Sequence, residues 1–179
     1  MSTMNILIAG FGGQGVLFAG KFLAYKGLLE DRQVSWLPSY GPEMRGGTAN
    51  CNVILSDDPI GSPIVNKPDC LIVMNKPSLD KFVDTVVPGG MILIDSTMID
   101  SKVERDDVTV YYVPASKLAG DAGFSTLANM ILVGKLLYAM KDKGMDNVEE
   151  ILKHVIPARK MDLLDINKKA IQTGYDYEA

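Results

Sequence analysis

The chain has 179 residues and a formal net charge of -4, with 47% hydrophobic and 22% charged residues. This length suits one hydrophobic core, so we expect a single domain over residues 1–179. The composition is that of a folded globular protein rather than a disordered one. The acidic net charge and the lack of a long Lys/Arg run argue against binding to nucleic acid.

Two further classes are disfavoured by the sequence. No apolar run approaches the roughly 20 residues that span a bilayer, and the start lacks a basic leader with a cleavage site, so we expect no membrane contact and a cytoplasmic location. Cys51 and Cys70 form no C-x-x-C pair, which argues against a metal or iron–sulfur site, and both are expected to be buried reduced thiols. His154 lies in a helical pattern and carries little weight as a catalytic base.

The first half of the chain alternates strand and helix patterns. Residues 5–9 are almost continuously apolar and end at glycines, which is typical of a strand buried on both faces of a parallel sheet. Apolar residues then recur at helical spacing over 16–29. Two more strands are predicted at 34–37 and 50–55, separated by a loop of turn-prone residues over 38–47.

The second half continues this alternation. Its predicted elements are strands at 70–74, 91–94 and 109–113, a helix that opens at Pro77, and helices at 125–141, 146–154 and 161–173. Ser125 is the predicted N-cap of the long helix, and Gly174 the predicted stop of the last. This order predicts a single three-layer α/β/α domain with a largely parallel central sheet, a Rossmann-like first strand–helix unit and a helical C-terminus.

A glycine-rich turn follows the first predicted strand and consists of Gly10, Phe11, Gly12, Gly13, Gln14 and Gly15. Glycines permit tight backbone turns, and free N–H groups at a helix start can face an anion, so a phosphate or pyrophosphate is the candidate ligand. A dinucleotide site would also need an acidic residue about 20 positions further on, where Trp36-Leu37-Pro38 stands instead. NAD or FAD binding is therefore disfavoured, and a purely structural turn remains open.

A second motif lies in the predicted loop and consists of Tyr40, Gly41, Pro42, Glu43, Met44, Arg45, Gly46 and Gly47. A simple connector needs neither a carboxylate and a guanidinium nor a glycine pair. Arg45 could make a bidentate contact with a carboxylate or phosphate, while the glycines allow close approach. The alternative is a surface ion pair between Glu43 and Arg45, which would contribute about 0–1 kcal/mol.

Taken together, GFGGQG and SYGPEMRGGTANCNV resemble the γ subunits of 2-oxoacid:ferredoxin oxidoreductases. The resemblance extends over essentially the whole chain and includes Tyr112-Val113-Pro114-Ala115 and Asn129-Met130, although residues 121–125 depart from the family pattern. It implies a complex that converts a 2-oxoacid, coenzyme A and oxidised ferredoxin to acyl-CoA, carbon dioxide and reduced ferredoxin. The partners implied are α, β and ferredoxin-like δ subunits, which hold thiamine diphosphate and iron–sulfur clusters, and ferredoxin itself.

The resemblance also implies roles for the two motifs. The glycine-rich turn and the loop 40–47 would face the thiamine-binding subunits and shape the cleft that coenzyme A enters, with Glu43 orienting Arg45. No catalytic residue and no stably bound cofactor or metal are expected in this chain alone. Asn129 is a weaker candidate, because an asparagine at a helix start can simply satisfy local backbone groups.

The substrate and the state of the isolated chain are less constrained. Among 2-oxoglutarate, pyruvate, branched-chain and aromatic oxoacids, 2-oxoglutarate is favoured by general similarity. Two other functions remain open, namely an independent nucleotide-binding oxidoreductase and a non-catalytic assembly subunit. A γ-type subunit without its partners would expose apolar surface and could form a homodimer.

Overall fold

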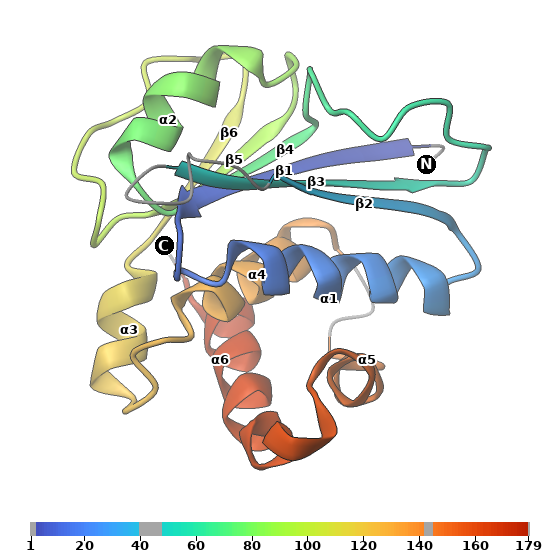
Figure 1. Cartoon of the computed structure of the whole chain (residues 1–179). Coiled ribbons are helices and arrows are strands. Elements are labelled where there is room, and N and C mark those ends of the chain that lie inside the picture. Colours follow the sequence, from blue (N-terminus) through green and yellow to red (C-terminus); the bar gives the residue numbers. More distant parts are fainter. Residues whose placement is uncertain (1–2, 40–47, 142–144, 179) are drawn as a thin grey trace.

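The computed structural model describes residues 3–39, 48–141 and 145–178. It has a six-stranded sheet in the order β2-β3-β1-β4-β5-β6, with helices on both faces (Figure 1). The strands are β1 (Thr3–Phe11), β2 (Gln33–Ser39), β3 (Thr48–Ser56), β4 (Cys70–Val73), β5 (Met91–Asp95) and β6 (Thr109–Val113). The helices are α1 (Val16–Leu29), α2 (Lys76–Phe82), η2 (Val83–Thr85), α3 (Ala115–Asp121), α4 (Ala128–Ala139), α5 (Val148–Val155), η3 (Ala158–Leu163) and α6 (Leu164–Asp176).

The direction of the strands confirms the predicted α/β architecture. β4 pairs parallel to β1, β5 to β4 and β6 to β5, whereas β3 runs antiparallel to both β1 and β2. Only β3 therefore opposes the common direction within the described sheet. Across the parts of the chain that the structure describes, no helix is long and apolar enough to cross a membrane.

The central strands β1, β4 and β5 are buried on both faces, which explains their nearly continuous apolar runs. Along β1, Ile6 and Ile8 pack into the core beneath α1, α4, α5 and α6, while Leu7 packs on the other face. That second core also includes Leu79 of α2. Because side chains alternate between the faces of a strand, each face needs its own apolar set.

The crossing of α4 and α6 shows that Gly174 was wrongly predicted as a helix stop. A side-chain carbon at Gly174 would lie 1.7 Å from the carbonyl oxygen of Ile131, and one at Gly134 would lie 1.9 Å from that of Ile171. Helix α6 runs through Gly174 to Asp176. The glycine is thus explained by close backbone packing and not by helix termination.

Three other details of the C-terminal half differ from the predictions. Helix α4 begins at Ala128 after Leu127, and no side chain caps it, so the predicted N-cap at Ser125 is wrong. The stretch predicted as one helix from 161 is a 3-10 segment, η3, followed by α6. Helix α3 was not predicted, because its start depends on the distant Asp95, whose carboxylate accepts hydrogen bonds from the backbone N–H and the hydroxyl of Ser116.

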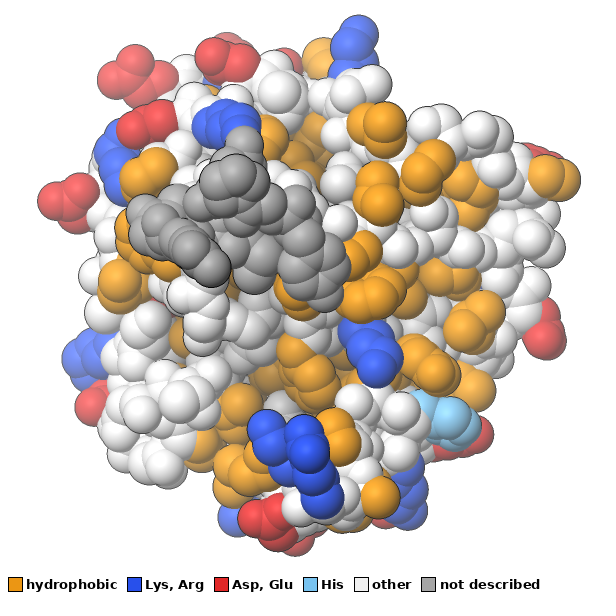
Figure 2. Space-filling model, in the orientation of Figure 1, with side chains coloured by type: hydrophobic (Ala, Val, Ile, Leu, Met, Phe, Trp, Pro, Cys, Tyr) orange, Lys and Arg blue, Asp and Glu red, His pale blue; other side chains and the backbone are white. Residues whose placement is uncertain are grey.

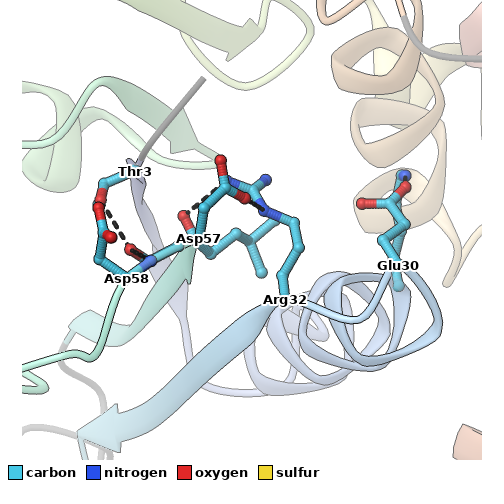
Figure 3. Close-up of polar contacts among 8 residues, drawn as sticks. Thr3, Glu30, Arg32, Asp57 and Asp58 are labelled. Atoms are coloured by element: carbon cyan, nitrogen blue, oxygen red, sulfur yellow. Dashed lines mark hydrogen bonds and ion pairs between the residues drawn. The ribbon is translucent and has the colours of Figure 1, made fainter.

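A polar cluster lies at the end of the sheet where β1 begins and β3 ends (Figure 3). The Arg32 Nε atom lies 3.2 Å from Asp57 Oδ1, and Arg32 Nη2 donates to the carbonyl oxygen of Leu55 at 3.1 Å. The hydroxyls of Thr3 and Ser56 are hydrogen-bonded at 2.8 Å. Since the glycine-rich turn follows the opposite end of β1, this cluster serves the fold and not the candidate site.

Candidate functional site

The glycine-rich turn connects the end of β1 to the start of α1. Gly13 and Gly15 adopt φ angles of 90° and 75°, a left-handed conformation that glycine adopts without steric cost. Gly12 and Gly13 are exposed, and a side-chain carbon at Gly13 would meet nothing within 4 Å. The backbone of these two residues is therefore open to an approaching group.

Gln14 holds the turn in place. The N–H of Phe11 donates to Gln14 Oε1 at 2.6 Å, and Gln14 Nε2 donates to the carbonyl oxygen of Met74 at 3.1 Å. The side chain thus ties the end of β1 to the residue after β4. A side-chain carbon at Gly10 would lie 2.6 Å from the same Gln14 oxygen, so Gly10 makes room for this bridge.

Asn129 contacts the turn from α4. Its Nδ2 atom donates to the carbonyl oxygen of Gly15 at 3.0 Å, across 114 residues of sequence. A side-chain carbon at Gly15 would lie 2.3 Å from that nitrogen, so the contact depends on glycine. Asn129 is 4% exposed, and its Oδ1 atom has no hydrogen-bond partner among the described residues. The structure therefore brings together two candidates that the sequence could not connect.

The turn lies at a topological switch point of the sheet. The helix that follows β1 packs on one face, and the helix that follows the neighbouring parallel strand β4 packs on the other. Crevices at such points, at the carboxyl ends of strands, are where α/β proteins bind ligands. Asn75 lies there too and was missed: its Oδ1 accepts the N–H of Ser78 at 2.9 Å, while its buried Nδ2 has no partner in the described chain. An asparagine shortly before Pro77-Ser78 is a helix-cap signal that could have identified it.

The second motif lies outside the described residues, and with it the candidates Tyr40, Gly41, Glu43, Arg45, Gly46 and Gly47. The residues that flank it are described. Ser39 ends β2 opposite Asn50, and Thr48 begins β3 opposite Phe11. The chain therefore enters and leaves this segment at the same edge of the sheet as the glycine-rich turn.

The arrangement does not suit a dinucleotide. In a Rossmann site the ribose-binding acid comes from the parallel strand beside β1. Here the strand between β1 and β2 is the antiparallel β3, and β2 ends with Pro38-Ser39. The nucleotide-dependent alternative therefore lacks both the strand and the acid that it requires within the described sheet.

The two cysteines are buried and unbonded, as predicted. Burial raises the pKa of Cys51 to about 12, against a hydrogen bond from Trp36 that lowers it. Burial also raises the pKa of Cys70, and the nearby Asp69 raises it further. Thiols that stay protonated are poor metal ligands. Within residues 3–39, 48–141 and 145–178, no group of three or more His, Cys, Asp or Glu side chains could hold a metal ion.

A groove of about 440 Å³ opens beside the turn, and we call it the α1–η3 groove. Its lining residues are Gly15, Leu17, Phe18, Lys21, Trp36, Leu127, Asn129, Val155, Ile156, Pro157, Lys160, Leu163 and Asn167. The volume is within the range of small-ligand and peptide-anchor pockets. No sequence motif marks Lys21 or Lys160, because the groove is assembled from distant elements.

The fold and the turn define an α/β domain whose candidate site is a glycine-rich turn at the carboxyl edge of a mixed sheet. The family described as pyruvate ferredoxin/flavodoxin oxidoreductase matches residues 5–177, and the chain belongs to that family. The resemblance inferred from the two motifs is confirmed.

Two relatives illustrate the similarity in sequence. The ketoisovalerate oxidoreductase subunit VorA of Methanothermobacter thermautotrophicus is 40% identical over 177 residues, which is 97% of this chain but 36% of VorA. The 2-oxoglutarate synthase subunit KorC of Methanocaldococcus jannaschii is 33% identical over 156 residues, 86% of this chain and 83% of KorC. The chain thus spans about a third of VorA and most of KorC.

Two solved structures share the fold. The γ subunit of a keto/oxoacid ferredoxin oxidoreductase from Geobacter sulfurreducens is 25% identical with a TM-score of 0.84, over 98% of this chain and 96% of that one. A 2-oxoglutarate:ferredoxin oxidoreductase chain from Magnetococcus marinus is 21% identical with a TM-score of 0.85, over 98% of this chain and 31% of that one. The second likeness concerns the fold alone.

Proposed function

We propose that the chain is the γ-type subunit of a thiamine diphosphate-dependent 2-oxoacid:ferredoxin oxidoreductase. The complex converts a 2-oxoacid, coenzyme A and oxidised ferredoxin to acyl-CoA, carbon dioxide and reduced ferredoxin. One observation carries the proposal: the chain matches KorC over most of both lengths, and KorC is named as a subunit of 2-oxoglutarate synthase. The chain acts in the assembled complex and not alone.

The cofactors belong to the other subunits in this proposal. A cluster needs accessible thiolates, and the two thiols here are buried, on strands β3 and β4, with raised pKa values. They do not fit an iron–sulfur cluster. We therefore assign thiamine diphosphate and the clusters to α, β and ferredoxin-like δ subunits, and ferredoxin takes the electrons. We also propose a cytoplasmic location for the complex.

The partner that contacts this chain corresponds to the part of VorA outside the match. VorA is 40% identical to this chain, yet the match covers only 36% of it, so there the same domain is continuous with further sequence. A domain can be its own chain in one protein and part of a longer chain in another. If the interface is retained, the domain contacts the same neighbouring domain in both. The separate subunit that replaces the remainder of VorA is accordingly the expected neighbour.

The glycine-rich turn contributes positioning and electrostatics to the cleft that coenzyme A enters. The exposed backbone of Gly12 and Gly13 offers N–H groups to a phosphate, and Arg45 adds a cation, oriented by Glu43. Both motifs start from the same edge of the sheet, since Phe11 pairs with Thr48. This common edge supports a joint role for the turn and the loop 40–47.

Replacement of Arg45 by Ala tests this role. A charge-assisted hydrogen bond contributes about 1.5–3 kcal/mol, so the variant complex should show about a 10- to 100-fold higher KM for coenzyme A. The thermal midpoint of the isolated subunit should not change. Lys169→Ala removes an equal charge from the exposed surface of α6 and serves as the control. An unchanged KM in an intact complex would remove Arg45 from the proposal.

The favoured substrate is 2-oxoglutarate, because KorC and this chain match over most of their lengths. Ketoisovalerate is the second candidate, since VorA has the higher identity of the two. The test is anaerobic purification of the tagged chain from its source, identification of the co-purified subunits, and coenzyme A-dependent ferredoxin reduction with each 2-oxoacid. Recovery of the chain alone with a bound nucleotide would overturn the proposed function.

A further inference from the structure

The α1–η3 groove combines apolar walls with two cations. One side is formed by Phe18 of α1 and by Trp36 of β2, which is 37% exposed, and the other by the connection from α5 to α6. Figure 2 shows Lys and Arg side chains beside hydrophobic ones on the face that carries α1 and this connection. Exposed aromatic side chains in a concave site are typical of partner-binding surfaces.

The charge of the groove differs from that of the whole chain. The chain has a net charge of -4, yet the described lining includes Lys21 and Lys160 and no acidic residue. Neither lysine has an ion pair with another described residue, whereas Lys153 and Lys168 both pair with Glu149. A positive groove on an acidic protein complements a carboxylate-bearing partner.

Two buried asparagines contribute to the wall of the groove. Asn129 and Asn167 are 4% and 2% exposed, and each uses its amide N–H group, toward Gly15 and Leu163 respectively. The Oδ1 atom of each is itself buried and has no partner within the described chain. The groove therefore presents its apolar side chains and its two lysines to a partner, rather than these amide oxygens.

We propose that the α1–η3 groove is the docking site for a segment of the partner subunit that corresponds to the remainder of VorA. The segment places an apolar side chain against Phe18 and Trp36, and a carboxylate beside Lys21 and Lys160. This inference rests on the proposed function, because it requires the assembled complex. It assigns an interface to a surface that lies directly beside the glycine-rich turn, at Gly15.

The first test compares lysine acetylation in the active purified complex and in the isolated chain. We expect Lys21 and Lys160 to react about tenfold more slowly in the complex, as for amines buried in an ion pair. A zero-length carbodiimide cross-linker should join one or both to an Asp or Glu of the partner subunit. Equal reactivity in the two states, with an active complex, would overturn the docking site and leave the proposed function standing.

The second test uses charge reversal. The double variant Lys21→Glu, Lys160→Glu should weaken assembly with the partner by about 10- to 100-fold, because like charges then face each other. Lys169→Glu, with its exposed position outside the groove, should assemble normally. The double variant should keep its thermal midpoint, since neither lysine has an ion pair in the described chain.

Other occupants give distinct results. Protection of both lysines by coenzyme A alone, without the partner, would show a small-molecule pocket and overturn the docking site. Protection that appears only as the isolated chain dimerises would assign the groove to a second copy and overturn it as well. Failure to recover any complex with 2-oxoacid-dependent activity would refute the proposed function and this inference together.

Discussion

The close packing of α4 against α6 leads to a testable prediction for a substitution at Gly174. In Gly174→Ala the new carbon would lie 1.7 Å from the carbonyl oxygen of Ile131, and ordinary contact begins at 3.4 Å. The helices must therefore separate by about 1.7 Å, because the obstacle is backbone and cannot rotate away. Overpacking of this kind should outweigh the better helix propensity of alanine and lower the free energy of unfolding by about 2–4 kcal/mol.

The measurement is the thermal midpoint, which should fall by about 4–15 °C for a chain of this size. Gly120→Ala is the matched control, since Gly120 is also helical and its new carbon would meet nothing within 4 Å. That variant should be neutral or more stable by about 0.5 kcal/mol. If Gly174→Ala gained stability in the same way, the close approach of α4 and α6 would be refuted.

Two predictions concern pH. Hydrogen bonds from Lys153 and Lys168 lower the pKa of Glu149 from 4.5 to about 2, so the stability that they add is present above pH 4.5 and is lost as the pH falls toward 2. Urea unfolding of Glu149→Gln should therefore differ from wild type at pH 7 and converge with it at low pH. Burial lowers the pKa of Lys135, which means that the folded state releases its proton more easily. The free energy of unfolding of the wild type should rise relative to that of Lys135→Met as the pH rises toward about 10.4. Parallel plots of this free energy against pH for the two proteins would contradict the prediction.

The sequence predicts those elements whose residues carry their own signal. Strands β1, β4 and β5 are short apolar runs because helices cover both faces of the sheet. Helix α3 has no such signal, since its first turn is held by the carboxylate of Asp95, 21 residues earlier in the chain than Ser116. A glycine near a predicted helix end normally indicates termination, but Gly174 serves a contact with Ile131 that only the tertiary structure reveals.

The candidate site also contains some residues that the sequence reveals and others that only the fold reveals. Gly10 to Gly15 stand out in the sequence because a glycine cluster after an apolar strand is rare and physically specific. The link from Gly15 to Asn129 spans 114 residues and has no local pattern. Lys21 and Lys160 come from α1 and η3, and only packing places them on one groove. The sequence thus reveals the candidate residue types, whereas the fold decides which of these residues lie close together.

The glycine-rich turn contains two kinds of glycine, and a pair of variants separates them. Gly15→Ala would place a carbon 2.3 Å from the buried Asn129 at a φ of 75°, so both the fold and activity should suffer. Gly13→Ala meets open space, and its only penalty is a φ of 90°, which costs about 1–2 kcal/mol. If the exposed backbone binds coenzyme A, Gly13→Ala should assemble and fold yet raise the KM for coenzyme A by crowding the approach. An unchanged KM would mean that Gly13 serves only the turn, and the phosphate-binding role would then fall to the loop 40–47.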